Sequence, residues 1–219
     1  MYLIQELFDL THTMAEPMLS ACRYPWEALP QIGETICRLG LILPEADYDH
    51  PAEQVWIARS AVVAPTASIT GPCIIGPRTE VRHCAFIRGN ALIGSDAVVG
   101  NSTELKNVIL FDGVQVPHYN YVGDSILGYK AHLGAGAITS NVKGDRKPVV
   151  IRDQEERVET GMKKVGAFLG DYAEIGCGSV LNPGAVIGRR SVVYPMSCVR
   201  GTVPADSIYK KQGEVAERE

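Results

Sequence analysis

A bulky aliphatic residue recurs at every sixth position along much of this chain. One unbroken series has nine members: Ile57, Val63, Ile69, Ile75, Val81, Ile87, Ile93, Val99 and Leu105. The same spacing returns at Leu127 and Leu133, and again from Leu169 to Val199. A period of six differs from the roughly 3.6 of an amphipathic helix and the 2 of a half-buried strand. It is typical of a parallel β-helix, in which each short strand and its turn take six residues and point one large aliphatic side chain inward.

Small residues support this interpretation, because one lies four positions after each of the first eight aliphatic residues, where a tight corner is expected. Three six-residue units close one triangular coil, so residues 18 apart in the sequence occupy matching places on successive coils. The coils are stacked at the strand spacing of about 4.8 Å. The predicted fold class is therefore mainly β, with a β-helix over residues 51–203.

The segments outside the repeat have other patterns. Residues 1–50 show helical spacing, with Pro25 and Gly40 bounding one helical stretch, and predict a helical N-terminal cap or side domain. Residues 141–166 break the repeat with charge and Gly and predict a loop inserted into the coil, and such loops on rigid scaffolds are often functional. We expect residues 204–219 to form a tail that covers the other end of the coil.

Composition narrows the cellular context. The net charge of −4 gives no reason to expect nucleic acid as a partner, and no apolar run reaches the ~20 residues of a membrane span. The six cysteines form no CxxC pair, which argues against a structural zinc site or a disulfide framework and suits a reducing compartment. The first residues are acidic rather than basic, unlike a secretory signal. We expect a cytoplasmic protein without a membrane partner.

Two cations and one histidine suggest a site. Arg88 and Lys106 are 18 apart and each follows an inward aliphatic residue, so both should project outward from the same face. Two such cations favour a bridging anion, and Arg with Lys is a common phosphate-binding pair, although two solvated surface cations would give the same spacing. Residues 114–121 (VQVPHYNY) are expected to break the beat and to present His118 and Tyr121 near these cations. Histidine is the usual proton acceptor near neutral pH.

The stretch from Arg88 to Lys147 resembles the acetyltransferase domain of bifunctional UDP-N-acetylglucosamine pyrophosphorylase/glucosamine-1-phosphate N-acetyltransferases, within the hexapeptide-repeat acyltransferases. That family has an Arg, a Lys 18 residues later, a His after 12 more and a Tyr three beyond. Here these are Arg88, Lys106, His118 and Tyr121, followed by GDSILGYKAHLGAGAITSN. The resemblance implies a left-handed β-helix.

The resemblance also implies an activity, acetyl transfer from acetyl-CoA to an amino-sugar phosphate, and a homotrimer with sites at its interfaces. The roles implied for single residues are general base for His118, phosphate binding for Arg88 and Lys106, and sugar binding for Tyr121, Asn141 and Lys147. For acetyl-CoA the candidates are Gly134, Ala135, Gly136, Ala137 and Asp171, with Lys210 and Lys211 for its phosphates. Residues 1–50 contain no Gly-rich nucleotide loop, so we do not expect this chain to make the nucleotide sugar by itself.

Departures from the family pattern leave two alternatives open. His132 replaces an Asn, Val142 and Lys143 replace a Tyr-Asp pair, Asp171 replaces a serine, and the insertion around 148–166 is long. These changes would also suit a catalytically silent module that binds a sugar phosphate or nucleotide sugar. The second alternative is a zinc enzyme resembling γ-class carbonic anhydrases, with His83, His118 and His132 as ligands. The paired histidines of that family lie five apart, and this chain does not reproduce that spacing.

Overall fold

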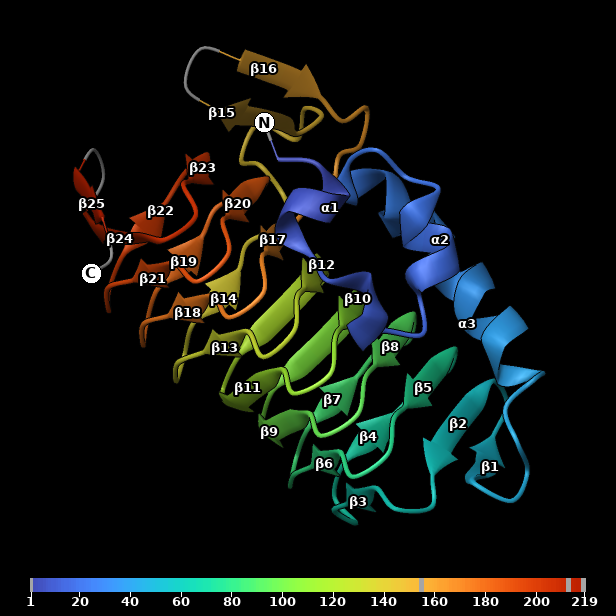
Figure 1. Cartoon of the computed structure of the whole chain (residues 1–219). Coiled ribbons are helices and arrows are strands. Elements are labelled where there is room, and N and C mark those ends of the chain that lie inside the picture. The colour runs from blue at the N-terminus through green and yellow to red at the C-terminus, as the bar shows by residue number, and fades with distance from the viewer. Residues whose placement is uncertain (1, 154–155, 212–213, 218–219) are drawn as a thin grey trace.

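The computed structural model describes residues 2–153, 156–211 and 214–217, and it shows a triangular β-helix flanked by short helices (Figure 1). Strands of successive coils pair in parallel along three faces. The left-handed parallel β-helix with an N-terminal helical segment, expected from the sequence, is confirmed.

The strands follow one another in a fixed order around each coil. Face one contains β2 (Val55–Ala58), β5 (Cys73–Ile75), β8 (Ala91–Ile93), the second half of β10 (Glu104–Leu110), the second half of β12 (Tyr121–Leu127), β17 (Ala167–Leu169), β20 (Ala185–Ile187) and β23 (Thr202–Val203). Face two contains β3 (Val62–Val63), β6 (Glu80–Val81), β9 (Val98–Asn101), β11 (Gln115–His118), β13 (His132–Leu133), β18 (Glu174–Ile175), β21 (Val192–Val193) and β24 (Ser207–Lys211). Face three contains β4 (Ser68–Ile69), β7 (Phe86–Ile87), the first halves of β10 and β12, β14 (Ile138–Thr139), β19 (Val180–Leu181) and β22 (Cys198–Val199).

We name the three corners after one residue each. The His118 corner joins face two to face three, the Lys106 corner joins face three to face one, and the Asp171 corner joins face one to face two.

The inward aliphatic residues fill the coil, and most of them have no solvent exposure. The spacing of the inward residues shortens from six to five between Leu105 and Leu110 and again between Val122 and Leu127. The register between β10 and β12 is therefore 17, and Lys106 pairs with Gly123 rather than with Asp124. The expected break at 114–121 is therefore wrong: β11 continues face two, and Val116 is fully buried opposite Val99.

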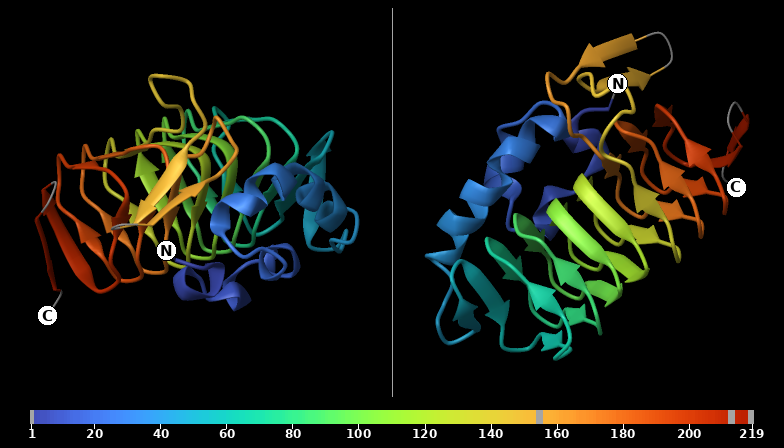
Figure 2. Two further views of the ribbon diagram at one scale, coloured as in Figure 1. Left: turned by 90° about the horizontal axis from the view of Figure 1, so that it is seen from above. Right: turned by 180° about the vertical axis from the view of Figure 1, so that it is seen from behind.

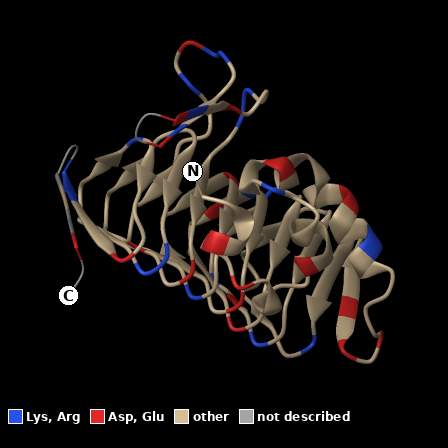
Figure 3. Cartoon of the chain, turned by 45° about the horizontal axis from the view of Figure 1, so that its top comes forward, with Lys and Arg blue, Asp and Glu red and all other residues tan. Residues whose placement is uncertain are grey.

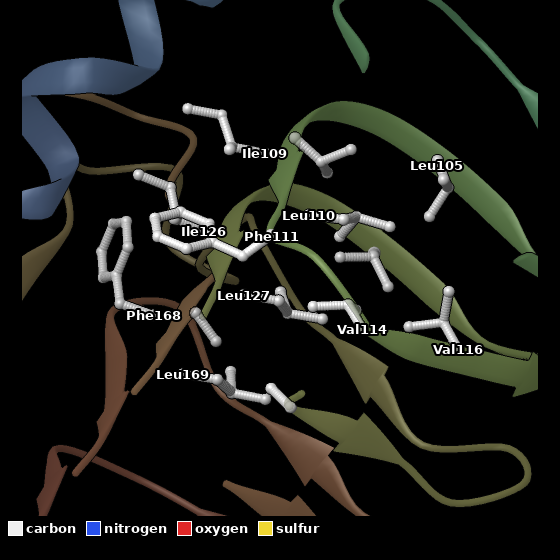
Figure 4. Packing of buried hydrophobic residues seen from close by; sticks show 14 of the residues in the cluster. Leu105, Ile109, Leu110, Phe111, Val114, Val116, Ile126, Leu127, Phe168 and Leu169 are labelled. Carbon is white, nitrogen blue, oxygen red and sulfur yellow. The ribbon is translucent and has the colours of Figure 1, made fainter. Parts of the chain in front are cut away.

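The N-terminal segment packs along face one. It contains α1 (Ile4–Leu7), a 3-10 turn at Leu10–His12, α2 (Glu16–Ser20), a 3-10 helix at Pro25–Gln31 and α3 (Ile32–Gly40). The outward side chains of face one, among them Ile109, Ile126 and Phe168, are buried beneath it (Figure 4). Figure 2 shows the helices along the side of the coil rather than over its end, so the segment is the side layer of the two possibilities and does not cap the coil.

Both coil ends are covered by antiparallel strands. At the first end β1 (Tyr48–Ala52) pairs with β2, and at the last end β25 (Glu214–Glu217) pairs with β24. The tail thus covers the end as expected, but β24 also pairs in parallel with β21, so the coil continues past residue 203. None of the helices in the described ranges has the length and apolar content of a membrane span.

The insertion forms a hairpin that packs against the outside of the last coils. Its strands are β15 (Val150–Asp153) and β16 (Glu156–Glu159). Ile151 is fully buried, and a Cβ added at Gly184 would lie 2.8 Å from its Cδ1 atom, so this part of the hairpin rests directly on the coil.

Three tyrosine hydroxyls and one cysteine thiol with raised pKa values predict that the protein loses stability in alkali. Burial is the main cause that raises the pKa of Tyr48, Tyr121 and Tyr209, and it raises the pKa of Cys73 to about 12. Since the unfolded chain then releases these protons at a lower pH than the folded chain, the free energy of unfolding is fully present below about pH 8.5 and falls as the pH rises through the raised values. Urea unfolding at pH 8 and above pH 10 measures this, and Tyr209→Phe should reduce the pH dependence; a pH-independent midpoint would contradict it.

Candidate functional site

A charged cluster occupies the Lys106 corner, centred on Asp124. The Asp124 carboxylate lies 3.1 Å from Lys106 Nζ and accepts hydrogen bonds from the side-chain amides of Asn107 (3.0 Å) and Asn141 (2.5 Å). Asn107 and Asp124 form the corner tips with φ of +55° and +48°, a left-handed conformation that Asn and Asp tolerate. The Asp124 side chain is only 5% exposed, so these partners hold it in one position.

Tyr121 and Arg88 extend the cluster across face three. The Asn141 amide also donates to the Tyr121 hydroxyl at 3.2 Å. Burial, and next the charge of Asp124, raise the pKa of Tyr121, so its hydroxyl stays protonated at neutral pH and can donate to a ligand. Arg88 donates to Glu104 at 2.6 Å, and this bond raises the pKa of Arg88.

Two carboxylates thus balance two cations, which changes the picture drawn from the sequence. Glu104 and Asp124, rather than a bridging anion, relieve the repulsion between Arg88 and Lys106. Sequence reasoning missed both acids, although Asp124 lies 18 residues after Lys106 and the same spacing rule would have found it. The Arg88–Glu104 pair is partly exposed, so an entering phosphate can displace Glu104 more easily than it can displace the buried Asp124.

His118 lies on the opposite edge of face three. Its side chain is exposed at the end of β11 and makes no hydrogen bond or ion pair to any residue that the structure describes. From Tyr119 to Asp124 the chain crosses face three in five residue steps, which at about 3.3 Å each makes the face roughly 16 Å wide. One chain therefore does not bring His118 and the Asp124 cluster together.

The expected thioester-binding turn lies directly beside His118, on the next coil. Gly136 donates its N–H to the His118 carbonyl at 2.9 Å, and the N–H groups of Gly134 and Ala137 also donate within the coil. These three N–H groups are therefore already used. Ala135 is exposed, and its N–H has no partner within the described part of the chain, so it is the donor of this turn that remains for a ligand.

On the following coils the His118 corner continues through Cys177 and Met196, whose side chains are exposed. Gly178 donates its N–H to Ala135 at 2.8 Å, and Met196 donates to Cys177 at 2.9 Å. Ala135, Cys177 and Met196 thus form a track of exposed residues along this corner. Sequence reasoning missed Cys177, although it lies in a Gly-Cys-Gly turn of the repeat.

Asp171 does not belong to this track, which corrects the expectation that it binds acetyl-CoA. It lies on the Asp171 corner with 1% exposure. Its carboxylate accepts the N–H groups of Asp9 (2.8 Å) and Tyr129 (2.9 Å) and pairs with the Arg189 guanidinium. Asp171 therefore fastens the N-terminal segment to the coil.

The remaining predicted residues lie outside the cluster. Lys147 is exposed in the insertion, and its described polar contact is a backbone donation to Asp145. Lys210 and Lys211 are exposed on β24, on the same face as β11 and separated from it by β21, β18 and β13, so they lie about 19 Å along the coil.

The histidines of the metal alternative have separate partners. His132 lies 2.8 Å from Glu174, and His83 lies 2.9 Å from Thr66. Among the described residues no three His, Cys, Asp or Glu side chains converge within one chain in a way that could hold a metal ion.

Comparison with known proteins gives a consistent picture. The domain family described as GMPPB C-terminal domain matches residues 69–154. The bifunctional protein GlmU of Methanococcus maripaludis is 35% identical over 128 residues, 58% of this chain and 31% of that protein. The bifunctional sugar-1-phosphate nucleotidylyltransferase/acetyltransferase of Sulfurisphaera tokodaii is 29% identical over 126 residues, again 58% and 31%.

A third relative has a more similar length. The uncharacterized acetyltransferase YaiX of Escherichia coli is 29% identical over 178 residues, which cover 73% of this chain and 76% of that protein. The chain spans about a third of the length of the bifunctional relatives it matches. It is thus a hexapeptide-repeat protein whose left-handed β-helix is similar in sequence to the bifunctional sugar-1-phosphate nucleotidylyltransferase/acetyltransferases.

Proposed function

We propose that this protein transfers an acetyl group from acetyl-CoA to the amine of an amino-sugar phosphate. One observation carries the proposal: an exposed His118 lies beside the N–H of Ala135, neither having a polar partner among the described residues, on the edge of the face that holds Arg88 and the Asp124 cluster. The names of the relatives, which include sugar-1-phosphate acetyltransferases, support this chemistry.

Each group has a defined task in the transfer. Acetyl-CoA supplies an activated acetyl thioester, and in this proposal it lies along the exposed residues from Ala135 to Cys177, in the direction of Lys210. His118 accepts the proton that the acceptor nitrogen loses as its C–N bond forms, and it returns a proton to the leaving sulfur as the C–S bond breaks. Ala135 N–H is placed to donate to the carbonyl oxygen. The products are the N-acetyl sugar phosphate and free coenzyme A.

The width of face three supports a site shared between copies of the chain, as in the homotrimer that the resemblance implies. An amino-sugar phosphate is much shorter than the roughly 16 Å between His118 and the Asp124 cluster of one chain. The site is complete when a second copy brings its His118 to the cluster of the first. Apolar residues exposed near this face, Phe86 (43%), Tyr119 (65%) and Met196 (82%), favour such contacts.

Release of coenzyme A thiol tests the proposed function. We expect turnover with glucosamine-1-phosphate or another amino-sugar phosphate, and much less with the same sugar lacking phosphate. Sugar-phosphate binding without any turnover would instead support the silent binding module, to which the His132 and Val142 departures also point.

Arg88→Ala should raise KM for the phosphorylated acceptor by about tenfold or more, because one charge-assisted bond to phosphate is worth ~1.5–3 kcal/mol. Loss of the exposed Arg88–Glu104 pair should change the stability little, because solvent screens both charges. Arg78→Ala is the matched control, since Arg78 makes a similar exposed pair with Asp96 on the Asp171 corner. Equal KM values for the two variants would remove Arg88 from the acceptor site.

A further inference from the structure

A cavity of about 850 Å³ lies between the insertion and the last coils, and none of its lining residues is a member of the Asp124 cluster. Its floor is the Lys106 corner of three coils, represented by Ser140, Asn182 and Arg200. Its roof includes Val150 and Arg152 of β15 together with the loop before that strand. The volume is in the usual range of small-molecule sites.

The cavity is lined by three cations and one acid. Lys143 Nζ lies 3.3 Å from Asp145, which also accepts the N–H of Lys147. That N–H, and next the bond from Lys143, lower the pKa of Asp145, so it stays ionised at neutral pH. Arg152 and Arg200 have no side-chain partner in the described ranges. The lining thus carries a net charge of about +2 at neutral pH.

The hairpin adds a further reason to expect an anion. Arg152 lies directly opposite Arg157 in the antiparallel pair of β15 and β16. Like charges at such positions are destabilising, although Asp153 and Glu156 of the same two strands place acids nearby, and Figure 3 shows both charges in this region. Ile151 anchors β15 against Gly184, so Arg152 projects from a fixed strand rather than from a free loop.

We propose that this cavity binds the diphosphate group of a phosphorylated small molecule. Two guanidinium groups can grip phosphate oxygens in bidentate fashion, and the Ser140 hydroxyl and Asn182 amide add neutral donors. None of the described lining residues is aromatic, so recognition rests on the phosphates rather than on stacking of a base. Arg200 follows β22, four strands along face three from Lys106, or about 19 Å, whereas Ser140 adjoins Asn141, so the cavity runs from beside the Asp124 cluster to the last coils.

Calorimetric titration with inorganic pyrophosphate, without acetyl-CoA, tests this site. The reference is the full chain carrying Arg88→Ala, so that the acceptor cluster contributes little. We expect measurable binding that weakens at least tenfold when Arg152→Ala and Arg200→Ala are added, and that is unchanged by adding Arg38→Ala on α3. Unchanged thermal melting of the variants verifies their folding.

Two results would overturn the proposal: no binding of pyrophosphate to the reference protein, or equal affinity after loss of Arg152 and Arg200. Competition then identifies the source of the diphosphate. Displacement of pyrophosphate by a nucleoside diphosphate sugar identifies an acceptor or effector, whereas displacement by desulfo-coenzyme A identifies the donor. Because binding is measured without turnover, the result does not depend on whether acetyl transfer takes place.

Discussion

His118→Ala is expected to slow acetyl transfer by a factor of about 10² to 10⁴, the usual contribution of a positioned general base. Its imidazole is exposed and makes no described polar contact, so the substitution removes a proton acceptor without breaking a structural bond. Binding of the phosphorylated acceptor should change little, because the phosphate-binding residues lie on the other edge of face three.

His83→Ala is the matched control. His83 lies at the same corner two coils earlier, since Asn101 pairs with His118 and donates its side-chain amide to the His83 carbonyl. We expect His83→Ala to retain turnover. Coenzyme A thiol release at saturating acetyl-CoA, with acceptor binding measured in parallel by calorimetry, separates the two effects. Full turnover in His118→Ala would show that another group, or solvent, accepts the proton.

The coil was predictable because its signal is local. Each inward aliphatic residue is specified within six residues, and the parallel pairing follows from repetition alone. The side layer was harder to predict, because nothing in residues 1–50 states which face they cover. A clue was present on face one, where Leu92, Ile109 and Ile126 precede an inward residue and are themselves apolar. Two successive apolar positions indicate a face buried on both sides.

The site was predictable in its residue types but not in its pairing. The 18-residue spacing placed Arg88 and Lys106 on one corner and also connects Lys106 with Asp124, but it missed that the register there is 17, so that Asp124 is the corner residue directly after Gly123, the partner of Lys106. For Asp171 the sequence was misleading, because its position in the repeat suggested a residue of the acetyl-CoA groove. Only the packing of the N-terminal segment, more than 160 residues away in sequence, shows that this carboxylate is buried.

That buried carboxylate leads to the largest expected effect on stability. Asp171→Ala should lower the free energy of unfolding by about 3 kcal/mol, toward the low end for a broken buried pair because Arg189 is 29% exposed. The substitution also leaves the N–H groups of Asp9 and Tyr129 without their acceptor. For a chain of this length the expected fall in Tm is about 6–12 °C.

Asp206→Ala separates burial from pairing. Asp206 pairs with Arg190 at 2.5 Å on the same corner, but both side chains are about half exposed, so its loss should lower the stability much less than loss of Asp171. Thermal unfolding compares the two variants, and limited proteolysis should cut residues 1–50 faster in Asp171→Ala alone, because the lost bonds hold that segment. Equal melting temperatures and equal cleavage would mean that apolar packing on face one holds the N-terminal segment without Asp171.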